Sequence, residues 1–534
     1  MSAMVAQQAL IANTSNNIAN VNTPGYTRRE ISLLNRADAA SIHSSFTFGS
    51  GVEVGTIRRI TSSFLEATVR DAASRQGMAN IADDYLGRIE NLFSLTGPQP
   101  TIGSTLNDFF SAVNTVAVNP SSVDDRLVLM QRGEDLVNAI KTTYNTIAQT
   151  QTELDYQVPQ ELQQINEYTK QIAQLNDLIL RRKGSNVPAI DEEDQRDALL
   201  TKLAEKITFS AAEMENGTMN ISLANGFPLV SGGTSRELGY TYTPSFGGAT
   251  LPPSLEGRTL GYVVYNFGSE SSPSHLDLTK TIKGGMGSLG GILQLRGYAE
   301  VSNTSAFQAD GDLVAIATRI EALTRSLLTD VNERYLGPDE DSSVAGLQSS
   351  AGDLLGGSPD VFGLFDFDYS GVKDADGDGV PSAADLLSSG MSHFSSYLRF
   401  AVTDPQRFAA ARDVDTTEGS AVFPGGDGQN AAALSALKQE VRTLSNGGFS
   451  LTGTFDELYS STVNYVGATK SKAETNVAVA KAAQVSAQTK RDQLSAVSLD
   501  EEFANLIKYQ KAFQASARLI KSASDMLEQL VALI

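Results

Sequence analysis

Apolar residues recur every seventh position in the C-terminal stretch of this 534-residue chain, from Gly467 to Ile534. After Gly467 no Gly or Pro interrupts the stretch, although the chain contains 45 Gly. Such a repeat is typical of a helix that packs lengthwise along another helix. An unbroken helix of this length would span roughly 100 Å, too long for the core of one compact domain. The apolar stripe consists of Leu499, Phe503, Leu506, Phe513, Ile520, Leu527, Val531 and Ile534.

A narrower apolar row occurs at the opposite end of the chain. Residues Ser2 to Asn20 form an Ala/Asn/Gln-rich segment with a helical period, which ends at Pro24-Gly25 because Pro cannot continue a helix. The row consists of Met4, Ile11 and Ile18. Each terminal helix therefore presents a stripe that needs a partner, and the pattern predicts that the two pair in an antiparallel arrangement.

Helical segments and short strands alternate between the termini. Helices are predicted over 62–93, 104–118, 123–182 (kinked at Pro159), 191–205, 306–335 and from 430 to the C-terminus. Residues 28–60 are expected to be extended or irregular. Short β-branched or aromatic runs at 207–209, 218–224, 238–243 and 260–266, separated by Asn-Gly, Gly-Gly and Pro-Pro, predict hairpins.

The pattern as a whole predicts an α+β multidomain chain. Long terminal helices form a coiled-coil or helical-bundle core, and β-rich domains are inserted in the middle of the chain. The predicted parts are a terminal core helix at 1–30 that pairs with 498–534, a helical domain at 31–206 and 430–497, a β-rich outer domain at 207–291, a helix at 292–336 that returns to the helical domain, and a Gly/Ser/Asp-rich outer insertion at 337–429.

Composition narrows the class of function. A formal net charge of −21 argues against a nucleic-acid partner, and the absence of Cys excludes disulfides and thiol chemistry. Three widely separated His leave little material for a zinc site or a His-based catalytic triad, so no enzymatic activity is predicted. No run approaches 18 apolar residues, and no Lys or Arg precedes Arg28, so neither membrane insertion nor a cleaved signal peptide is expected.

An acidic segment at 374–385 matches the spacing of calcium-binding loops, with an acid at the first, third, fifth and twelfth places. Gly379 permits the sharp turn that such a loop needs. The predicted oxygen ligands are Asp374, Asp376, Asp378, the Val380 carbonyl, Ser382 and Asp385. The segment therefore predicts a structural calcium site in the outer insertion, and the alternative is an acidic, solvated turn.

A second motif has a weaker interpretation. Residues 285–290 spell G-x-G-x-x-G, the phosphate-binding pattern of dinucleotide folds. No convincing βαβ unit surrounds it, so a Gly-rich turn before a helix is the better interpretation.

Both ends of the chain resemble the terminal signatures of the bacterial flagellar axial proteins, the family of rod, hook and hook-associated proteins. The N-terminal match comprises Ser15, Asn16, Asn17, Ile18, Asn20, Asn22, Pro24, Gly25 and Tyr26, and the C-terminal match runs from Ser498 to Leu530. Segments 106–126, 194–200 and 288–293 resemble the hook–filament junction proteins within that family. The resemblance covers nearly the whole chain except about 340–395.

This resemblance implies a structural protein of a tubular assembly that polymerises through its terminal helices and connects the hook to the filament. The implied partners are further copies in a helical or ring-like assembly, the hook protein, a second junction protein, the flagellar type III export apparatus and a cytoplasmic export chaperone. The implied location is extracellular, in the flagellum, after export without signal cleavage. Both termini are expected to be disordered in the single chain and to gain order from neighbours.

Two alternatives remain open from the sequence. Hook, rod and second junction proteins share the terminal signatures, although the long helical block at 104–206 argues against them. A secreted calcium-dependent adhesin would explain the acidity and the calcium-type loop, but it would not explain heptads at both ends of the chain.

Overall fold

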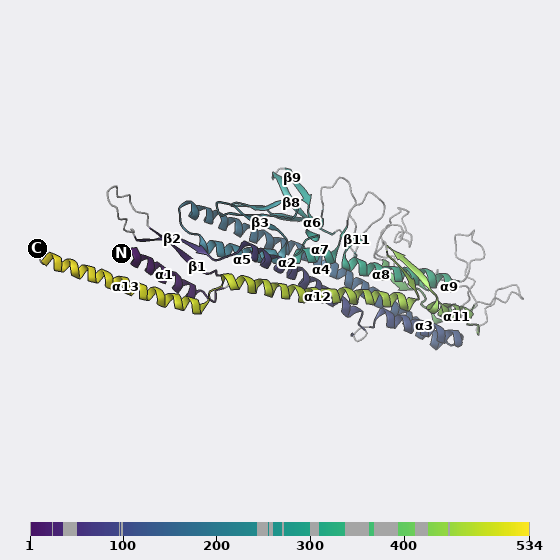
Figure 1. Cartoon of the computed structure of the whole chain (residues 1–534). Coiled ribbons are helices and arrows are strands. Elements are labelled where there is room, and N and C mark those ends of the chain that lie inside the picture. The colour runs from purple at the N-terminus through teal and green to yellow at the C-terminus, as the bar shows by residue number, and fades with distance from the viewer. Residues whose placement is uncertain are drawn as a thin grey trace, which may run out of the picture.

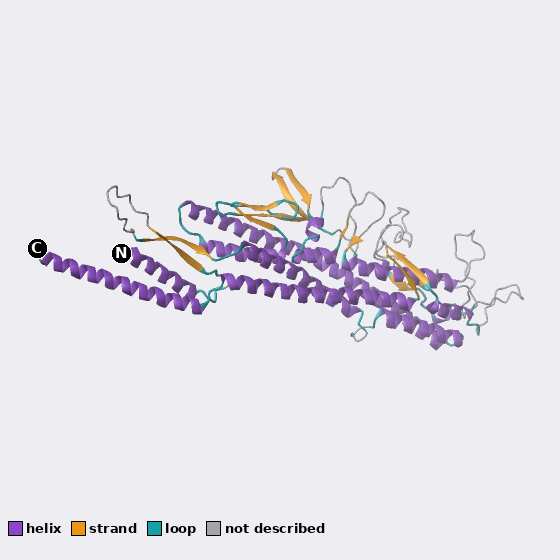
Figure 2. Ribbon diagram, viewed as in Figure 1, coloured by secondary structure: helices purple, strands orange, loops and turns teal. Residues whose placement is uncertain are grey.

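The chain is described from a computed structural model. The described residues are 2–23, 25–35, 51–94, 97, 100–242, 255, 260–269, 272–299, 309–336, 363–367, 394–411, 426–446 and 449–532. The described chain is elongated, with long helices along one axis and small sheets along one side (Figure 1, Figure 2). Both termini lie at the same end, where they form a slender projection.

The body of the molecule is a bundle of long helices. These are α2 (Ser63–Leu92), α3 (Ile102–Val118), α4 (Val123–Gly184), α5 (Ile190–Lys206) and α12 (Phe455–Ser495), joined by the shorter α7 (Ser288–Arg296) and α8 (Asp312–Ser326). Helix α2 packs along α12, and α3 packs along α4. Apolar side chains from all of these helices share one continuous buried core.

Local sequence signals set the ends of α4. At its start the Ser122 side chain accepts a hydrogen bond from Asp125 N, and acidic residues occupy the first turn. Arg181, Arg182 and Lys183 occupy the last turn, where cations stabilise the helix dipole. The helix therefore runs for 62 residues, with Pro159 inside it.

Two small antiparallel sheets lie against α4. One has the order β3 (Ser210–Glu213), β4 (Met219–Ser222), β5 (Pro228–Ser231), β6 (Thr234–Ser235), and the other β7 (Leu238–Thr241), β8 (Tyr262–Ser269), β9 (Ser272–Asp277). The buried Asn176 amide of α4 donates to Met219 O and Gly232 O at 2.8 Å each and accepts from Met219 N at 3.0 Å. One polar side chain thereby fixes the first sheet to the bundle.

Short elements complete the body. Near its middle lie α6 (Thr279–Lys283) and the pair of β10 (Tyr298–Ala299) with β11 (Ala309–Asp310) (Figure 1). Toward the end opposite the projection lie a π-helical turn (Leu327–Val331), α9 (Asn332–Leu336), β12 (Phe365–Phe367) with β13 (Leu398–Phe400), α11 (Gln429–Ala436), and β14 (Arg442–Asn446) with β15 (Phe449–Gly453). Phe109 packs on Phe110 and on Phe365 there, with ring centroids 5.3 and 5.5 Å apart. The buried Arg126 side chain donates to the carbonyls of Pro120 and Phe408, which holds the corner between α3 and α4.

The predicted α+β class is confirmed, but several predicted boundaries are wrong. Residues 207–209 form no strand, because Ile207 caps α5 through a 2.9 Å bond from its N–H to Leu203 O. The helix expected from 306 begins at Asp312. The helix expected from 430 is interrupted by the β14–β15 hairpin and restarts at Phe455, where Thr454 and Glu457 form a capping box.

The C-terminal heptad stretch is two helices, α12 and α13 (Leu499–Ala532), and not one. Ala496 has an extended backbone (φ −75°, ψ 156°), although no Gly or Pro lies there. The carbonyl of Ser495, freed at the end of α12, accepts a 2.8 Å hydrogen bond from Arg28 N. The carbonyl group left free where α12 ends is therefore hydrogen-bonded by a residue far away in the sequence.

The G-x-G-x-x-G segment is a packing turn. Gly287 has φ +91°, and a Cβ there would lie 2.5 Å from Lys206 O and 2.6 Å from Ile207 N. Glycine is therefore required for the close approach of this turn to the end of α5. The turn leads directly into the buried helix α7.

A buried carboxyl in α8 predicts a pH dependence of stability. Glu321 is fully buried, accepts from Ser395 N at 3.4 Å, and burial raises its pKa from 4.5 to about 8. The folded chain then binds more protons than the unfolded chain between these values, so the free energy of unfolding should fall as the pH rises from about 4.5 to about 8. Glu321→Gln should flatten this dependence in urea denaturation at pH 5 and pH 8.5. If the free energy of unfolding changed equally with pH in the parent chain and in the Glu321→Gln variant, Glu321 would not be the group responsible.

Candidate assembly arm and its joint

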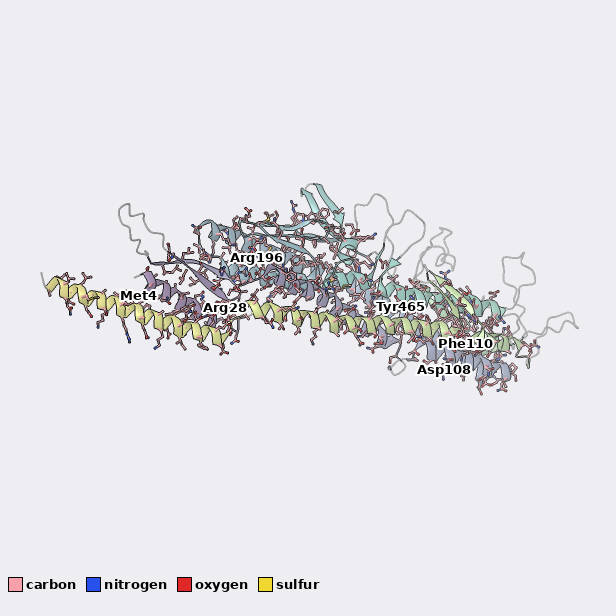
Figure 3. The ribbon with its side chains drawn as sticks, in the orientation of Figure 1. Met4, Arg28, Asp108, Phe110, Arg196 and Tyr465 are labelled. Atoms are coloured by element: carbon pink, nitrogen blue, oxygen red, sulfur yellow. The ribbon has the colours of Figure 1, made fainter. Side chains whose placement is uncertain are left out.

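The projection at one end of the molecule, here called the terminal arm, contains both ends of the chain. It consists of α1 (Ser2–Ala19), the antiparallel hairpin of β1 (Arg29–Asn35) and β2 (Val52–Arg59), and α13. Helix α1 runs antiparallel to α13 and also contacts both strands (Figure 1). Figure 3 places Met4 on the arm and Arg28 where the arm meets the body.

The seam between α1 and α13 covers only part of the predicted apolar stripe. Met4, Ile11, Ile18, Leu506 and Phe513 are half-buried. The other members, Leu499, Phe503, Ile520, Leu527 and Val531, are 37–69% exposed, and Ile534 lies outside the described residues. Both termini are helical here, unlike the disorder expected from the sequence, because each supplies the other with part of a packing surface.

The Asn-rich N-terminal signature forms a hydrogen-bonded turn. Asn17, which is buried, accepts from Tyr26 OH at 2.8 Å and from Arg29 N at 3.1 Å and donates to Arg29 O at 3.0 Å. Asn20 donates to Asn16 O at 3.0 Å and accepts from Thr23 at 3.2 Å. The signature thus folds β1 back onto α1. Its remaining members Ser15, Asn22 and Gly25 are exposed, and Pro24 lies outside the described residues.

Tyr26 connects this turn to the charged residues beside it. The guanidinium of Arg29 lies 4.7 Å from the centre of the Tyr26 ring, and burial raises the pKa of Tyr26 to about 12. The phenol therefore stays protonated and donates to Asn17. Its role is to fix the turn.

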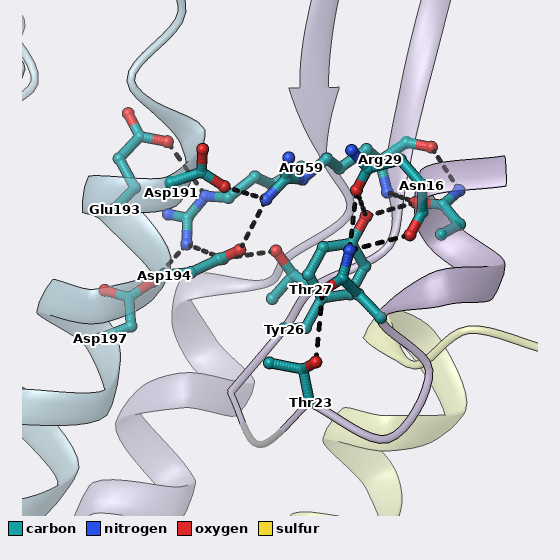
Figure 4. Close-up of polar contacts among 12 residues, drawn as sticks. Asn16, Thr23, Tyr26, Thr27, Arg29, Arg59, Asp191, Glu193, Asp194 and Asp197 are labelled. Atoms are coloured by element: carbon teal, nitrogen blue, oxygen red, sulfur yellow. Dashed lines mark hydrogen bonds and ion pairs between the residues drawn. The ribbon is translucent and has the colours of Figure 1, made fainter. Parts of the chain in front are cut away.

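A cluster of ion pairs, here called the joint, attaches the hairpin to α5 (Figure 4). Arg59 lies 3.0 Å from Glu193, 2.9 Å from Asp194 and 2.7 Å from Asp197. Thr27 Oγ1 donates to Asp194 at 2.6 Å, and Arg29 pairs with Asp191. Burial opposes the charge on Arg59, but the carboxylates of Asp197, Asp194 and Glu193 together outweigh burial and raise the pKa of Arg59.

The joint also holds the start of α13. Arg28 Nε lies 2.9 Å from Glu502, and Arg28 Nη1 lies 2.8 Å from Glu501. Because the backbone of Arg28 also bonds Ser495 O, one loop contacts α5, α12 and α13. The N-terminal signature, the C-terminal signature and the 194–200 segment therefore meet at one place. Sequence reasoning missed Arg28, Arg29 and Arg59, although Arg28 and Arg29 are the first charges in the chain.

Arg59→Met should loosen the arm on the body. The Arg59 side chain is 10% exposed, and its removal takes the ion-pair partner from Asp197 and the nearer of two cations from Asp194, at a cost of about 3–5 kcal/mol in the stability of the joint. Proteolysis in the 496–498 linker and amide exchange in β2 should both accelerate. Arg58→Met is the matched control, because Arg58 is 69% exposed in its pair with Glu30 and should change stability by less than about 1 kcal/mol. Equal cleavage of the two variants would refute the role of the joint.

No metal or membrane site emerges from the part of the chain that the structure describes. No group of three or more His, Cys, Asp or Glu in it could hold a metal ion. None of its helices combines the length and apolarity needed to cross a bilayer. The six predicted calcium ligands at 374–385 lie outside the described residues.

Comparison with known protein families gives matches to three family models. Residues 86–338 match the helical domain of flagellar hook-associated protein FlgK. Residues 491–533 match the C-terminal model of the flagellar basal body rod FlgEFG proteins, and residues 1–27 match the flagella basal body rod protein model. The two terminal matches coincide with α13 and with α1 and its turn.

The chain is similar over its whole length to curated flagellar hook-associated proteins 1. It is 26% identical to that of Escherichia coli K12 over 576 residues, covering 99% of this chain and 98% of the relative. It is 23% identical to that of Bacillus subtilis over 553 residues, covering 99% of this chain and 96% of the relative. The fold resembles the flagellar hook junction protein FlgK from Burkholderia pseudomallei, with a TM-score of 0.58 and 16% identity over 82% of this chain and 100% of that one.

Proposed function

We propose that this chain, which is similar over its whole length to flagellar hook-associated proteins 1, forms the junction between the hook and the filament of the bacterial flagellum. Its role is structural: subunits polymerise through their terminal helices and present surfaces to the axial components on either side. The observation that supports this proposal is the apolar stripe of α13, which includes five side chains that are 37–69% exposed: Leu499, Phe503, Ile520, Leu527 and Val531.

The arm and the body have different parts in this function. The body is a rigid bundle with one continuous core, so it sets the geometry of a subunit. The arm displays the apolar surface, and the joint fixes its direction. When one surface of a subunit binds a different surface of the next subunit, the contact is heterologous. Repeated heterologous contacts generate rings or helical tubes.

The partners proposed are the hook protein, a second hook-associated junction protein, the flagellar export apparatus and a cytoplasmic export chaperone. The proposed location is the outside of the cell, reached by flagellar type III export without signal cleavage. The family is one of structural proteins, and we propose no catalytic activity for the chain.

Deletion of the gene tests the function directly. Electron microscopy of the deletion strain should show hooks without filaments, and complementation with the full chain should restore them. Normal filaments on the deletion strain would refute a junction role.

Calcium binding at 374–385 remains a prediction from the sequence. Calorimetry on the full chain should show one calcium-binding event that Asp376→Asn weakens by at least tenfold, because a central ligand loses its charge. Asp366→Asn, an acid outside the segment, is the control and should bind calcium as the parent chain does. Absence of binding heat in the parent chain would favour the acidic turn.

A further inference from the structure

A small cavity lies inside the joint, at the place where the arm leaves the body. Its volume is about 70 Å³, and four segments enclose it: the loop after α1, the start of α2, the middle of α5, and the end of α12 with the break that follows it. Thr27, Asp197 and Ser495 are among the lining residues. Because these segments belong to both the arm and the body, a swing of the arm must change the shape of the cavity.

Glu66 is a carboxyl that the joint buries without an ion pair. It belongs to the first turn of α2, lines the cavity and is 9% exposed. No ion pair or hydrogen bond joins its carboxyl to another side chain in the described part of the chain. Asp194 and Asp197, by contrast, both pair with Arg59, at 2.9 and 2.7 Å (Figure 4). A buried carboxylate without a partner is unfavourable, so the neutral acid is favoured at Glu66.

Charged and titratable groups surround Glu66 from every element that packs there. Burial and the carboxylate of Asp197 raise the pKa of Glu66, and the nearby arginines lower it by less. The loop contributes only a neutral phenol, since the pKa of Tyr26 is raised to about 12. The surrounding groups are Arg59 of β2, Arg70 of α2, Asp197 of α5, Arg491 and Asp492 of α12, and Tyr26 of the loop.

The same cavity holds a second polar group without a partner. Ser495 is 3% exposed, and its hydroxyl forms no hydrogen bond within the described residues. It is the last residue of α12, directly before the break at 496–498. The polar contacts of the joint are therefore least complete at Glu66 and Ser495, where water could supply hydrogen bonds if the cavity opened.

We propose that Glu66 is a proton-controlled latch between the arm and the body. With its proton, the neutral carboxyl is tolerated beside Asp197 and the cavity stays closed. Without the proton, a second negative charge faces Asp197 in a buried site, so the cavity opens to water and the arm swings about residues 496–498. The closed state binds the proton more tightly than the open state, so a rise in pH favours opening. This latch goes beyond the proposed function, because it acts in the single subunit and needs no assembly partner.

The absence of Cys permits two spin labels on the full chain, one on each side of the break. They are attached at Ser486→Cys on α12 and Lys508→Cys on α13, both exposed positions. Pulsed EPR should give one narrow distribution of label distances at pH 5. At pH 8 a second population should be larger than at pH 5 by at least threefold. Glu66→Gln keeps the shape of the side chain but cannot carry the charge, so it should show the narrow distribution at both pH values.

Glu90→Gln is the matched control, because Glu90 is an exposed acid of the same helix, and this variant should keep the pH dependence of the parent chain. Glu66→Met, a second uncharged variant of similar size, should behave as Glu66→Gln does and covers a folding failure of that variant. Two results would overturn the inference: equal distance distributions of the parent chain at pH 5 and pH 8, or the parent's pH dependence in a folded Glu66 variant. Neither result would alter the outcome expected for the deletion strain, which tests the junction role separately.

Discussion

Leu506→Asp is expected to abolish filament attachment in cells that otherwise express and fold the protein. Leu506 lies in the α1–α13 seam, where it is half-buried. The substitution loses part of the roughly 1.5–3 kcal/mol that a buried Leu contributes and places a carboxylate against the charge-free helix α1. Because the same seam recurs in every subunit of a polymer, the effect on assembly multiplies. Motility assays and electron microscopy of a complemented deletion strain measure the result.

The matched control is Ala504→Asp. Ala504 is exposed and lies two residues before Leu506, on the other side of α13, so this variant introduces the same charge without entering the seam. It should support normal filaments, and the purified body of both variants should unfold as the parent does. Normal swimming with Leu506→Asp would show that the seam is dispensable, and the same prediction applies to Ile520→Asp.

Arg296→Met is expected to be the most destabilising single substitution of those considered in the body. Arg296 pairs with Asp155, donates to Tyr240 OH at 2.7 Å and to Gly261 O at 3.0 Å, and its side chain is 1% exposed. Removing one partner of a buried pair leaves the other charge uncompensated, at a cost of about 3–5 kcal/mol. The melting temperature of the body should fall by about 10 °C in scanning calorimetry.

The double variant Asp155→Leu with Arg296→Met distinguishes loss of packing from an isolated charge. Replacing both members of a buried pair is often close to neutral, so the double variant should recover much of the lost stability. Recovery of less than about 1 kcal/mol would show that Tyr240 and Gly261, and not the carboxylate, account for the effect.

The long helices could be predicted from the sequence because their signals are local. The predicted 123–182 helix agrees with α4 within two residues, since Ser122, the cationic last turn and the apolar period all lie in the same segment. The buried Arg126 belongs to one of the segments that resemble junction proteins. The two helices of the arm could likewise be predicted, because the absence of charge in α1 and the heptads in α13 are signals within each helix.

The joint could not be predicted, because its members are far apart in the sequence. Arg59 and Asp194 are separated by 135 residues, and Arg28 and Glu502 by 474. The break between α12 and α13 is equally non-local, since it depends on Arg28 N and not on a Gly or Pro. Periodicity could show that 498–534 packs on another helix, but it could not show which members of the stripe are half-buried and which are exposed.

The length of α4 gives the joint mechanical leverage. At 62 residues this helix is a strut of about 93 Å. A rotation of only about 5° at the joint would therefore sweep the far end of the body through about 8 Å, from the length of the strut. Small adjustments of the arm at the joint would thus reach the far end of the body as large displacements.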